Sequence, residues 1–355
     1  MTKLTTYEID IVKAKQSKLT NVDFENLQFG RTFTDHMFIC DYADGEWKQP
    51  KIIPYQAMTM EPSSRVFHYG QAVFEGMKAY KDENGKVFLF RPEENFKRIN
   101  KSAARLAIPE FPKDYFFEGL TTLLKIDSNW IKSGKGNSLY IRPFVIATEP
   151  AISASPASTY RFMIICSPAK AYYTGEVRVL FAEKYSRSAN GGVGFAKAAG
   201  NYAAQFYPTS LAQQKGYQQV IWTDAHTHEF LEEAGTMNIF FRINDTLITA
   251  PISDRILDGI TRKSIIQLAQ DNHIAVEVRP VRVSEIKEAS KKGTLKEIFG
   301  AGTAAVVSPI SAFEHAEEVF ELPHLETSYA GLLKEQMLNI QQNLAEDKHQ
   351  WRFEV

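Results

Sequence analysis

One lysine lies in a segment that is otherwise made of small and apolar residues. The segment runs from Gly191 to Tyr202 and reads Gly-Gly-Val-Gly-Phe-Ala-Lys-Ala-Ala-Gly-Asn-Tyr, with the lysine at position 197. An amine with few polar neighbours favours its uncharged form, which is a nucleophile able to form a Schiff base. The alternative is a flexible surface loop with a solvated lysine, because lysines are mostly exposed. The residue types alone leave both interpretations open.

Two acidic residues, Glu232 and Glu233, stand directly before a strand-like run that begins near Gly235. A turn with solvated acids is the ordinary interpretation of such a pair. The functional interpretation is a buried carboxylate that faces the cationic ring nitrogen of a cofactor. The two interpretations differ in one observable, the burial of the carboxylates.

The segment Leu257–Arg262 opens a helical pattern. Backbone N–H groups at a helix N-terminus, together with the Thr261 hydroxyl, can bind an anion. The simpler interpretation is an ordinary helix with Asp258 as its N-cap. By itself this motif is weak.

A further small-residue segment, Phe299–Ala305, matches the Gly-x-Gly-x-x-Ala pattern of dinucleotide-binding turns. That pattern needs a helix after it, but Val306 and Val307 are β-branched and Pro309 interrupts the run. We therefore discount a dinucleotide site. A turn that exposes backbone N–H groups to a phosphate or carboxylate fits the residues better.

Aromatic residues next to arginines recur in the N-terminal half. They occur in the run His68–Tyr80, in Phe90-Arg91-Pro92 and in Tyr140-Ile141-Arg142. Core aromatics and surface arginines would explain each of these segments singly.

Hydrophobic periodicity and turn residues predict the elements that position these segments. In the first half we expect helices that begin at Pro92 and Pro112, the second extending through Ile131, and strands at Thr32–Asp41, Val87–Phe90, Leu139–Ala147 and Tyr160–Cys166. In the second half we expect helices at Ile260–Asn272 and Leu332–Leu344, and strands at Val177–Phe181, Gln218–Thr223, Met237–Ile243, Leu247–Ala250 and Ile274–Val278.

The order of these elements predicts an α+β protein, because strands and helices come in runs and not in strict alternation. The segment Ser167–Gly175 contains Pro, Gly and Tyr and is the candidate linker. We predict an N-terminal domain over residues 1–168, a linker over 169–176, and a C-terminal domain over 177–355 that carries Lys197.

Composition excludes several function classes. The 355 residues are 44% apolar and 23% charged, which excludes a disordered or fibrous chain. The net charge of −1 offers no basic excess for nucleic acid. No apolar run approaches the roughly 20 residues of a membrane span, and the N-terminal residues resemble no signal peptide. Cys40 and Cys166 fit neither a zinc spacing nor a disulfide framework, and His226 with His228 lacks further ligands, so we expect no metal and a cytoplasmic protein.

Taken in order, the blocks FEGMKAY, FRP, KAAGNY, EAGTMN, LDGITR and FGAGTA resemble those of the fold-type IV pyridoxal phosphate enzymes, and within them the branched-chain amino acid aminotransferases. The resemblance covers the chain from about Phe29 to the C-terminus. It implies a two-domain α+β fold like that of D-amino acid aminotransferase, with a small N-terminal α/β domain and a larger C-terminal mixed β domain. It also implies pyridoxal 5'-phosphate as cofactor.

The resemblance assigns cofactor roles to matching residues. Lys197 would hold the cofactor as a Schiff base and then move the proton at the substrate Cα. Glu233 would face the pyridine nitrogen, Tyr202 would bind the phenolic oxygen, and Leu257 would pack on the ring. The phosphate would be bound by residues that supply an arginine, a helix N-terminus and a turn: Arg91, Gly259, Ile260, Thr261 and Thr303.

Substrate roles follow from the same resemblance. Thr236 and the backbone of Ala304 and Ala305 would receive the α-carboxylate, and Arg142 would bind the distal carboxylate of glutamate. An apolar pocket for the branched side chain would be lined by Phe74, Tyr69, Tyr140 and Tyr172, although the spacing does not decide between Tyr172 and Tyr173. Ile152 of a second subunit would close the pocket, which implies a homodimer.

The implied activity is transamination between leucine, isoleucine or valine and 2-oxoglutarate, giving branched 2-oxo acids and glutamate. A D-amino acid aminotransferase or an aminodeoxychorismate lyase is the alternative of the same fold, but those relatives are shorter and lack the combined FEGMKAY and YIRP blocks. A nicotinamide-dependent oxidoreductase conflicts with Pro309, and a non-catalytic binding protein would have no use for Lys197.

Some relatives carry a Cys-x-x-Cys pair after the GTA turn, where this chain has Ala305 and Ser308, so we expect no thiol switch there.

Overall fold

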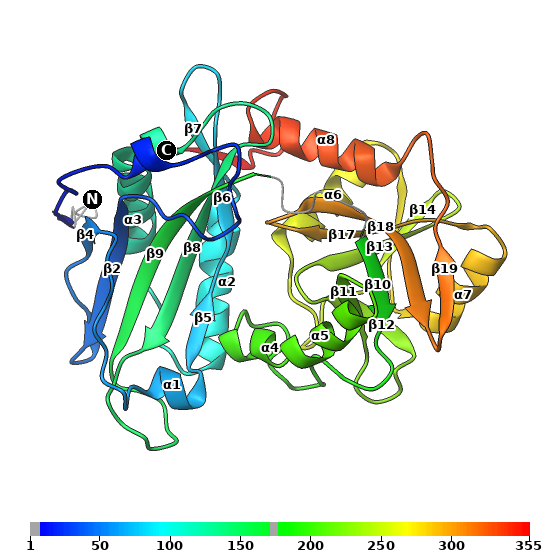
Figure 1. Cartoon of the computed structure of the whole chain (residues 1–355), viewed down its shortest axis with the longest axis horizontal. Coiled ribbons are helices and arrows are strands. Elements are labelled where there is room, and N and C mark those ends of the chain that lie inside the picture. Colours follow the sequence, from blue (N-terminus) through cyan, green and yellow to red (C-terminus); the bar gives the residue numbers. More distant parts are fainter. Residues whose placement is uncertain (1–7, 171–176) are drawn as a thin grey trace, which may run out of the picture. The chain divides into compact units, whose positions relative to one another are not determined.

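The computed structural model describes residues 8–170 and 177–355. The described chain divides into two compact units, both visible in Figure 1. Unit 1 contains the residues up to 170 together with two later segments, Ala196–Ala199 and Gln341–Val355. Unit 2 contains residues 177–195 and Gly200–Ile340. Each unit combines helices with a large sheet, which confirms the expected α+β class.

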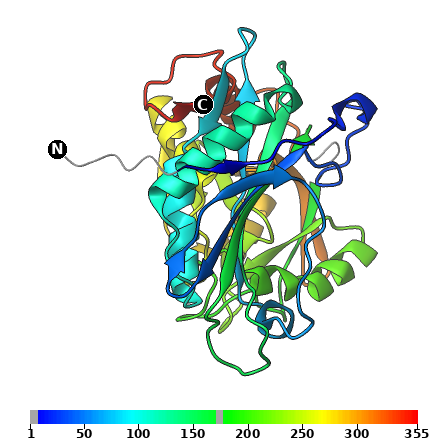
Figure 2. The ribbon, with the colours of Figure 1, turned by 90° about the vertical axis from the view of Figure 1, so that its left-hand side faces the viewer.

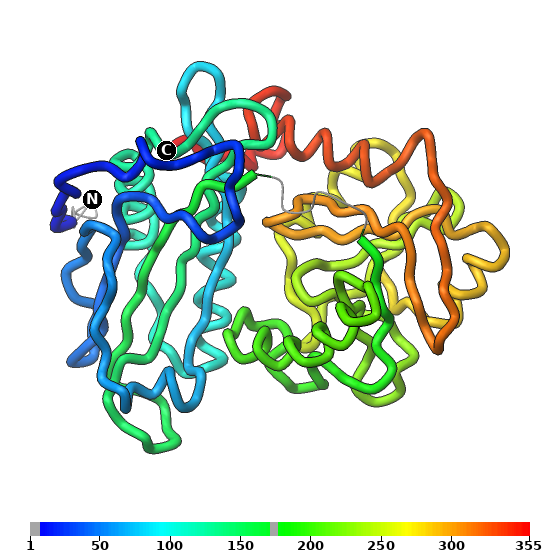
Figure 3. Tube along the Cα trace, viewed as in Figure 1, coloured from blue at the N-terminus to red at the C-terminus, as the bar shows by residue number. Residues whose placement is uncertain are grey.

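Unit 1 is built on a ten-stranded sheet with the order β1-β4-β2-β9-β8-β6-β7-β20, to which β3 adds on β2 and β5 on β8. Apart from the parallel pair β1–β4, the strands of this sheet pair antiparallel. The strands are β1 (Asp10–Ile11), β2 (His36–Ala43), β3 (Glu46–Trp47), β4 (Lys51–Pro54), β5 (Ala72–Phe74), β6 (Met77–Lys81), β7 (Val87–Phe90), β8 (Ser138–Ala147), β9 (Tyr160–Ala169) and β20 (Arg352–Glu354). The last strand returns to this unit, as the trace in Figure 3 shows.

The long helices α2 (Pro92–Arg105) and α3 (Lys113–Ile126) cover one face of this sheet, as Figures 1 and 2 show. Helix α2 starts with Pro92 and has Glu93 and Glu94 in its first turn, where the helix dipole favours acids. Helix α3 approaches β2 closely at Gly119, because a Cβ there would collide with the Phe38 ring. The unit also contains α1 (Arg65–Tyr69) and the 3-10 helices Leu19–Asn21 and Ser128–Trp130.

Aromatic rings fill the core between α3 and the sheet of unit 1. The rings of Phe111 and Phe162 are stacked with centroids 3.7 Å apart, and both lie edge-on to Phe38. Buried aromatic side chains of this size contribute the largest share of hydrophobic stabilisation, so this cluster fixes α3 on the sheet.

Unit 2 is built on a second ten-stranded sheet with the order β15-β14-β13-β17-β18-β10-β11-β12-β16, to which β19 adds on β18. Strand β12 also pairs with β13. The strands are β10 (Val177–Phe181), β11 (Gln219–Thr223), β12 (Phe230–Ala234), β13 (Asn238–Ile243), β14 (Thr246–Thr249), β15 (Ala275–Val278), β16 (Val281–Arg282), β17 (Leu295–Gly302), β18 (Val306–His315) and β19 (Glu318–Glu321). The sheet is mixed, since β10 pairs parallel with both β11 and β18.

The helices of the second half are α4 (Ala199–Ala203), α5 (Phe206–Gln214), α6 (Ile260–Asp271), α7 (Val283–Lys291) and α8 (Tyr329–Gln341). Helix α5 packs on β11, and α6 packs on β15 and β17. Helix α7 packs on β16 and β17. No helix within residues 8–170 and 177–355 is long and apolar enough to cross a membrane.

Several sequence-based element limits are wrong. The strand expected at Thr32–Asp41 is His36–Ala43, and the helix expected at Leu332–Leu344 is Tyr329–Gln341. The helix that begins after Pro112 ends at Ile126 and does not extend through Ile131, because the Asp127 carboxylate binds the backbone N–H and the ring of His36 on β2. Strand β9 continues to Ala169, so the first residues of the candidate linker belong to a strand. Residues 171–176 lie outside the described chain, and the predicted domain limits remain a prediction.

Candidate functional site

The main chain of Lys197 is fixed on both sides within unit 1. Its carbonyl oxygen accepts the Phe74 N–H at 3.1 Å, next to an antiparallel bridge between Val73 and Ala198. Its own N–H donates to the Ser102 hydroxyl on α2 at 2.9 Å, and Ser102 is fully buried. Lys197 and Ala198 therefore lie beside β5, joined to it by a single antiparallel bridge just before α4 begins at Ala199. This geometry excludes the flexible-loop interpretation of the lysine.

The Lys197 side chain lies over an aromatic ring. Its Nζ is 4.5 Å from the centroid of Phe74, and the guanidinium carbon of Arg142 lies 4.6 Å from the same centroid. Cations are attracted to the faces of aromatic rings, and more strongly where water is excluded. The Phe74 ring is therefore the common neighbour of the two cations.

Arg142 is itself positioned by Tyr140. Its Nη2 donates to the Tyr140 hydroxyl at 2.8 Å, while its buried Nε has no hydrogen-bond partner among the described residues. Tyr140 reaches this position because residue 76 is glycine, since a Cβ there would collide with the Tyr140 hydroxyl. Unit 1 thus brings Lys197, Phe74, Tyr140 and Arg142 into one cluster.

Three other predicted residues of unit 1 lie in other contacts. Arg91 precedes α2 in the left-handed conformation, with φ of 50°, and its guanidinium carbon lies 5.2 Å from the Trp351 ring centroid. Tyr69, on α1, is exposed and donates from its hydroxyl to the carbonyl oxygen of Ile152, whose side chain is 69% exposed. Tyr69 and Ile152 therefore lie together on the surface of this unit.

Glu232 and Glu233 are both buried, which excludes the solvated-turn interpretation. The Glu233 carboxylate accepts from Arg187 Nη1 at 2.8 Å, from Asn238 Nδ2 at 3.1 Å and from the Leu257 N–H at 3.2 Å. Three donors of this kind hold a carboxylate in one orientation. Glu232 pairs instead with Arg255, and burial raises the pKa of Glu232 despite that arginine.

The Glu233 network continues to the start of α6. Asn238 donates from the same Nδ2 to the Leu257 carbonyl oxygen at 3.0 Å, and a Cβ on Gly259 would collide with the Asn238 side chain. The N-cap of α6 is Gly259, not Asp258, and it makes no side-chain capping bond. Ile260 and Thr261 form the first turn, with Thr261 only 8% exposed. Unit 2 therefore brings Glu233, Leu257, Gly259, Ile260 and Thr261 together.

Residues Thr303, Ala304 and Ala305 form the turn between β17 and β18. The two strands pair antiparallel, from the pair Ile298–Ile310 to the pair Gly302–Val306. A strand and not a helix therefore follows the Gly-x-Gly pattern, as expected. A Cβ on Gly302 would lie 3.0 Å from the Thr236 carbonyl oxygen, which places Thr236 against this turn. Because Asn238 pairs with Ala301, the turn and the Glu233 network share one end of the sheet.

Two predicted residues remain. Tyr202 is half-buried on α4. Tyr172, with its alternative Tyr173, lies outside the described residues.

Sequence reasoning missed several residues that hold the predicted ones in place. Ser102 accepts the Lys197 N–H, Arg98 pairs with Glu75, and Arg187 and Asn238 hold Glu233. The one signal for Glu75 was an acid inside the apolar FEGMKAY block. For Arg98 and Ser102 the sequence offered no signal beyond their helical spacing. Charged and hydroxyl residues on a helix are normally solvated, so the residue types did not single them out.

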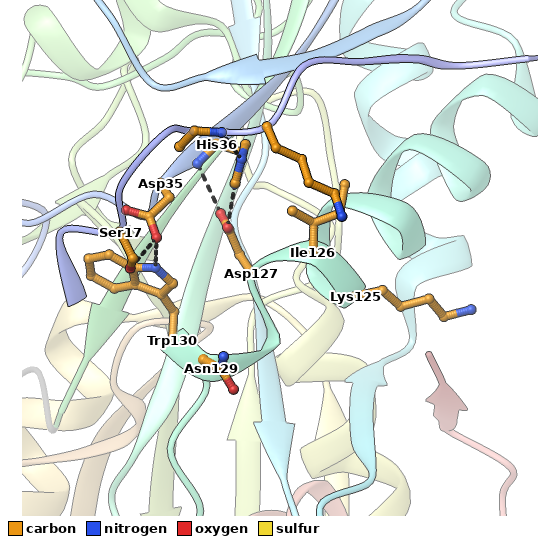
Figure 4. Close-up of a pocket in the computed structure, with 10 residues that line it drawn as sticks. Ser17, Asp35, His36, Lys125, Ile126, Asp127, Asn129 and Trp130 are labelled. Atoms are coloured by element: carbon orange, nitrogen blue, oxygen red, sulfur yellow. Dashed lines mark hydrogen bonds and ion pairs between the residues drawn. The ribbon is translucent and has the colours of Figure 1, made fainter. Parts of the chain in front are cut away.

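A pocket of about 470 Å³ in unit 1 contains none of the predicted residues (Figure 4). Its acids are already paired: Asp35 accepts from Ser17 and Trp130, and Asp127 lies 2.6 Å from Nδ1 of His36. The other ring nitrogen of His36 accepts the Ala14 N–H at 2.8 Å. These bonds anchor the N-terminal segment to the sheet. Among the described residues, no group of three or more His, Cys, Asp or Glu side chains is placed to hold a metal ion.

Comparison with known proteins places this geometry in a family. Residues 72–313 match the family described as Amino-transferase class IV. The chain is 42% identical to "Branched-chain-amino-acid aminotransferase 2" of Bacillus subtilis, over 100% of this chain and 98% of that protein. It is 45% identical to a "Probable branched-chain-amino-acid aminotransferase" of Staphylococcus epidermidis, over 96% of this chain and 97% of that protein.

Solved structures show the same fold. The branched-chain aminotransferase of Thermoproteus uzoniensis, solved with norvaline, superposes with a TM-score of 0.75 at 23% identity, covering 90% of this chain and 99% of that chain. The Escherichia coli branched-chain amino acid aminotransferase gives a TM-score of 0.74 at 24% identity, with 90% and 98% covered. The family match spans most of the chain, and the two curated relatives align over nearly their whole length. The chain therefore belongs to the class IV aminotransferases.

Proposed function

We propose that the chain catalyses pyridoxal phosphate-dependent transamination between leucine, isoleucine or valine and 2-oxoglutarate, yielding branched 2-oxo acids and glutamate. The sequence identity of 42–45% over nearly the full length to proteins named for this activity carries the proposal. The fixed position of Lys197 supports it, because a Schiff-base lysine needs a defined backbone.

The donor set fits the cofactor. The first turn of α6 has no acidic residue and its N-cap makes no side-chain bond, so this helix N-terminus suits a phosphate. The buried and oriented Glu233 suits a protonated pyridine nitrogen. When bound, pyridoxal phosphate supplies an electron sink that stabilises negative charge at the substrate Cα.

Each residue then has one task. Lys197 would hold the cofactor through its amine and would act as general base and acid on the substrate Cα proton. Glu233, oriented by Arg187 and Asn238, would accept the pyridine N–H. Tyr202 would bind the phenolic oxygen and Leu257 would pack on the ring, while the phosphate would be held by Arg91, Gly259, Ile260, Thr261 and Thr303.

The substrate residues divide between carboxylate and side chain. Thr236 and the backbone of Ala304 and Ala305 bind the α-carboxylate. Phe74, Tyr69 and Tyr140 line the apolar pocket with Tyr172, and Arg142 binds the distal carboxylate of glutamate. The Nε of Arg142 supports this role: it is buried and has no acceptor within residues 8–170 and 177–355, which favours a ligand that provides one.

The assembly we propose is a homodimer in the cytoplasm, in which Ile152 of one subunit covers the pocket of the other. The large exposed fraction of Ile152 supports this, since an isoleucine at the tip of a loop gains by burial in a partner. Sedimentation velocity of the purified chain tests the dimer, and a monomeric species at micromolar concentration contradicts it.

An absorption spectrum of the purified protein before and after addition of L-leucine tests the function. We expect a cofactor band that shifts on addition of L-leucine and returns with 2-oxoglutarate. Lys197→Ala should abolish turnover, and turnover at a sizeable fraction of the wild-type rate contradicts the role of Lys197. A band that responds to D-amino acids and not to L-leucine contradicts the proposal and favours the D-amino acid aminotransferase alternative.

A further inference from the structure

A buried arginine, Arg65, lies beneath the loop that carries Ile152. Arg65 is the first residue of α1 and is only 5% exposed, although arginine side chains are mostly found at the surface. Residues 149–158 belong to the loop between β8 and β9, which lies beside α1 in Figures 1 and 2. The reaction described above gives Arg65 no task, so its burial requires an explanation.

The Arg65 guanidinium binds four residues of this loop. Its Nη1 donates to the carbonyl oxygen and the hydroxyl of Ser155, at 2.6 Å and 2.8 Å, and to the carbonyl oxygen of Pro156. Its Nη2 donates to the Ser153 hydroxyl at 2.8 Å and to the Glu149 carboxylate at 3.1 Å. Because a guanidinium carries several N–H groups in a rigid plane, one side chain fixes four points of the loop.

Main-chain hydrogen bonds fasten the base of the same loop. The Thr148 N–H donates to the Thr159 carbonyl oxygen at 3.0 Å, which brings the two ends of the loop together. The Glu149 carbonyl oxygen accepts the N–H groups of Arg65 and Ala151, each at 3.0 Å. The loop is therefore closed at its ends and held from within by Arg65, so its main chain has a defined conformation.

Ile152 projects from this ordered loop. Its carbonyl oxygen accepts the hydroxyl of Tyr69, the last residue of α1, while its side chain is 69% exposed. The next residue, Ser153, is held by Arg65. An apolar side chain on a fixed main chain suits an interface anchor, because the loop is already ordered before the partner arrives.

Overall stability accounts less well for Arg65. Within residues 8–170 and 177–355, its guanidinium donates only to this loop, and its buried Nε has no hydrogen-bond partner. A buried ion pair often stabilises a protein no more than apolar residues of similar volume do. The specific effect of the guanidinium is therefore the fixed conformation of the loop.

We propose that Arg65 is a positioning residue for Ile152: it holds residues 149–158 in the conformation that presents this isoleucine to the substrate pocket of a second copy of the chain. The inference rests on the proposed function, in which Ile152 of one subunit covers the pocket of the other. A loop that is ordered in advance lets Ile152 contact a branched side chain without an ordering cost on substrate binding. Arg65 thus acts on substrate affinity and not on the chemical step.

Hydrogen exchange of the full-length chain tests the order of the loop without using activity. Mass spectrometry follows the peptide 149–158, in which the N–H groups of Ala151, Ser155 and Ser158 are hydrogen-bonded. Arg65→Met removes the guanidinium and keeps an unbranched side chain. Exchange in this peptide should become at least about fivefold faster, while exchange in β9 should stay unchanged.

Two further variants make this experiment specific. Arg161→Met is the matched control, because it removes another arginine of unit 1 that is paired with a carboxylate, that of Asp41. It should leave exchange in the loop unchanged. Glu149→Gln keeps the measurement possible if Arg65→Met does not fold, since it weakens one bond of Arg65 and should accelerate the same exchange to a smaller extent.

Kinetics with L-leucine tests the link from Arg65 to Ile152. Arg65→Met and Ile152→Ala should each raise KM roughly three- to tenfold and leave kcat within about twofold of the wild type. Because Arg65 acts through Ile152, the double variant should have the KM of Ile152→Ala alone. A merely structural role of Arg65 instead lowers kcat and adds its own effect to that of Ile152→Ala.

Three results overturn the inference: unchanged loop exchange in a folded Arg65→Met protein, an unchanged leucine KM in that protein, or KM effects that multiply in the double variant. An unchanged KM in Ile152→Ala overturns it as well, together with the proposed cover of the pocket. Failure of the proposed transamination is distinguishable from all of these, because the spectrum of the wild-type protein then does not respond to L-leucine.

Discussion

The Lys197 amine lies 4.5 Å from the centre of the Phe74 ring, and the main chains of these two residues are joined by a hydrogen bond. The same ring carries the Arg142 guanidinium at 4.6 Å. One aromatic side chain therefore sets the position of the predicted catalytic lysine and of the predicted specificity arginine. Because both contacts depend on Phe74, a change at this ring affects both functions.

Arg142→Ala should impair the reaction with glutamate or 2-oxoglutarate far more than the reaction with leucine. Only the dicarboxylates offer a second carboxylate, and a charge-assisted bond of about 1.5–3 kcal/mol corresponds to a loss of roughly ten- to a hundredfold in kcat/KM. Single-turnover kinetics of each half-reaction measures this difference. Arg161→Ala is the control. Arg161 lies on the neighbouring strand β9 and is paired with Asp41 of β2. Equal losses in both half-reactions rule out the assignment.

Ser102→Ala should destabilise the protein by about 1 kcal/mol, because the partly buried Lys197 N–H loses its acceptor. It should also lower kcat, since the lysine main chain is then held on one side only. Chemical denaturation measures the stability, with Ser138→Ala as control, whose hydroxyl makes only a 3.3 Å bond to the Ala169 carbonyl oxygen. An unchanged free energy of unfolding for Ser102→Ala contradicts a stabilising role for the hydrogen bond between Ser102 and the Lys197 main chain.

Asp224 should make the stability of the protein depend on pH in the acid range. Burial opposes its ionisation, but N–H groups of Phe230, Thr227 and Glu229 bind its carboxylate and lower its pKa to about 2. Because the folded-state pKa lies below the unfolded value of 3.8, the stabilisation is complete above about pH 4 and is lost as the pH falls toward 2.

Asp224→Asn should therefore cost about 2 kcal/mol at pH 7, and the difference from wild type should shrink below pH 4. Urea denaturation at a series of pH values measures both proteins. A difference that stays constant from pH 7 to pH 2.5 shows that the charge of Asp224 is not the cause.

Neither cysteine should react rapidly in the folded protein. Both side chains are buried, burial raises the pKa of Cys40 to about 12, and it raises the pKa of Cys166 well above the ordinary value. Because the thiolate is the reactive form, a disulfide reagent at pH 8 should titrate no thiol quickly in the native protein and two in denaturant. One fast-reacting native thiol contradicts this expectation.

Local pattern determined much of this protein. Val87–Phe90 and Val177–Phe181 are strands within the expected limits, and α2 begins at Pro92, because periodicity and proline placement act over a few neighbouring residues. The β-branched residues after Gly302 correctly excluded a helix there. The six ordered blocks identified the family, which the comparisons confirmed.

Tertiary structure decided how the candidate site is held. The pattern around Asp258 named the wrong cap, since the close packing of Asn238 against Gly259 sets the start of α6. Glu75, Arg98 and Arg187 look like surface charges in the sequence, and only the fold shows them buried and paired. Such a pairing joins residues 23 or more positions apart. Its stability comes from the exclusion of water by both partners together, which no local pattern of residues can encode.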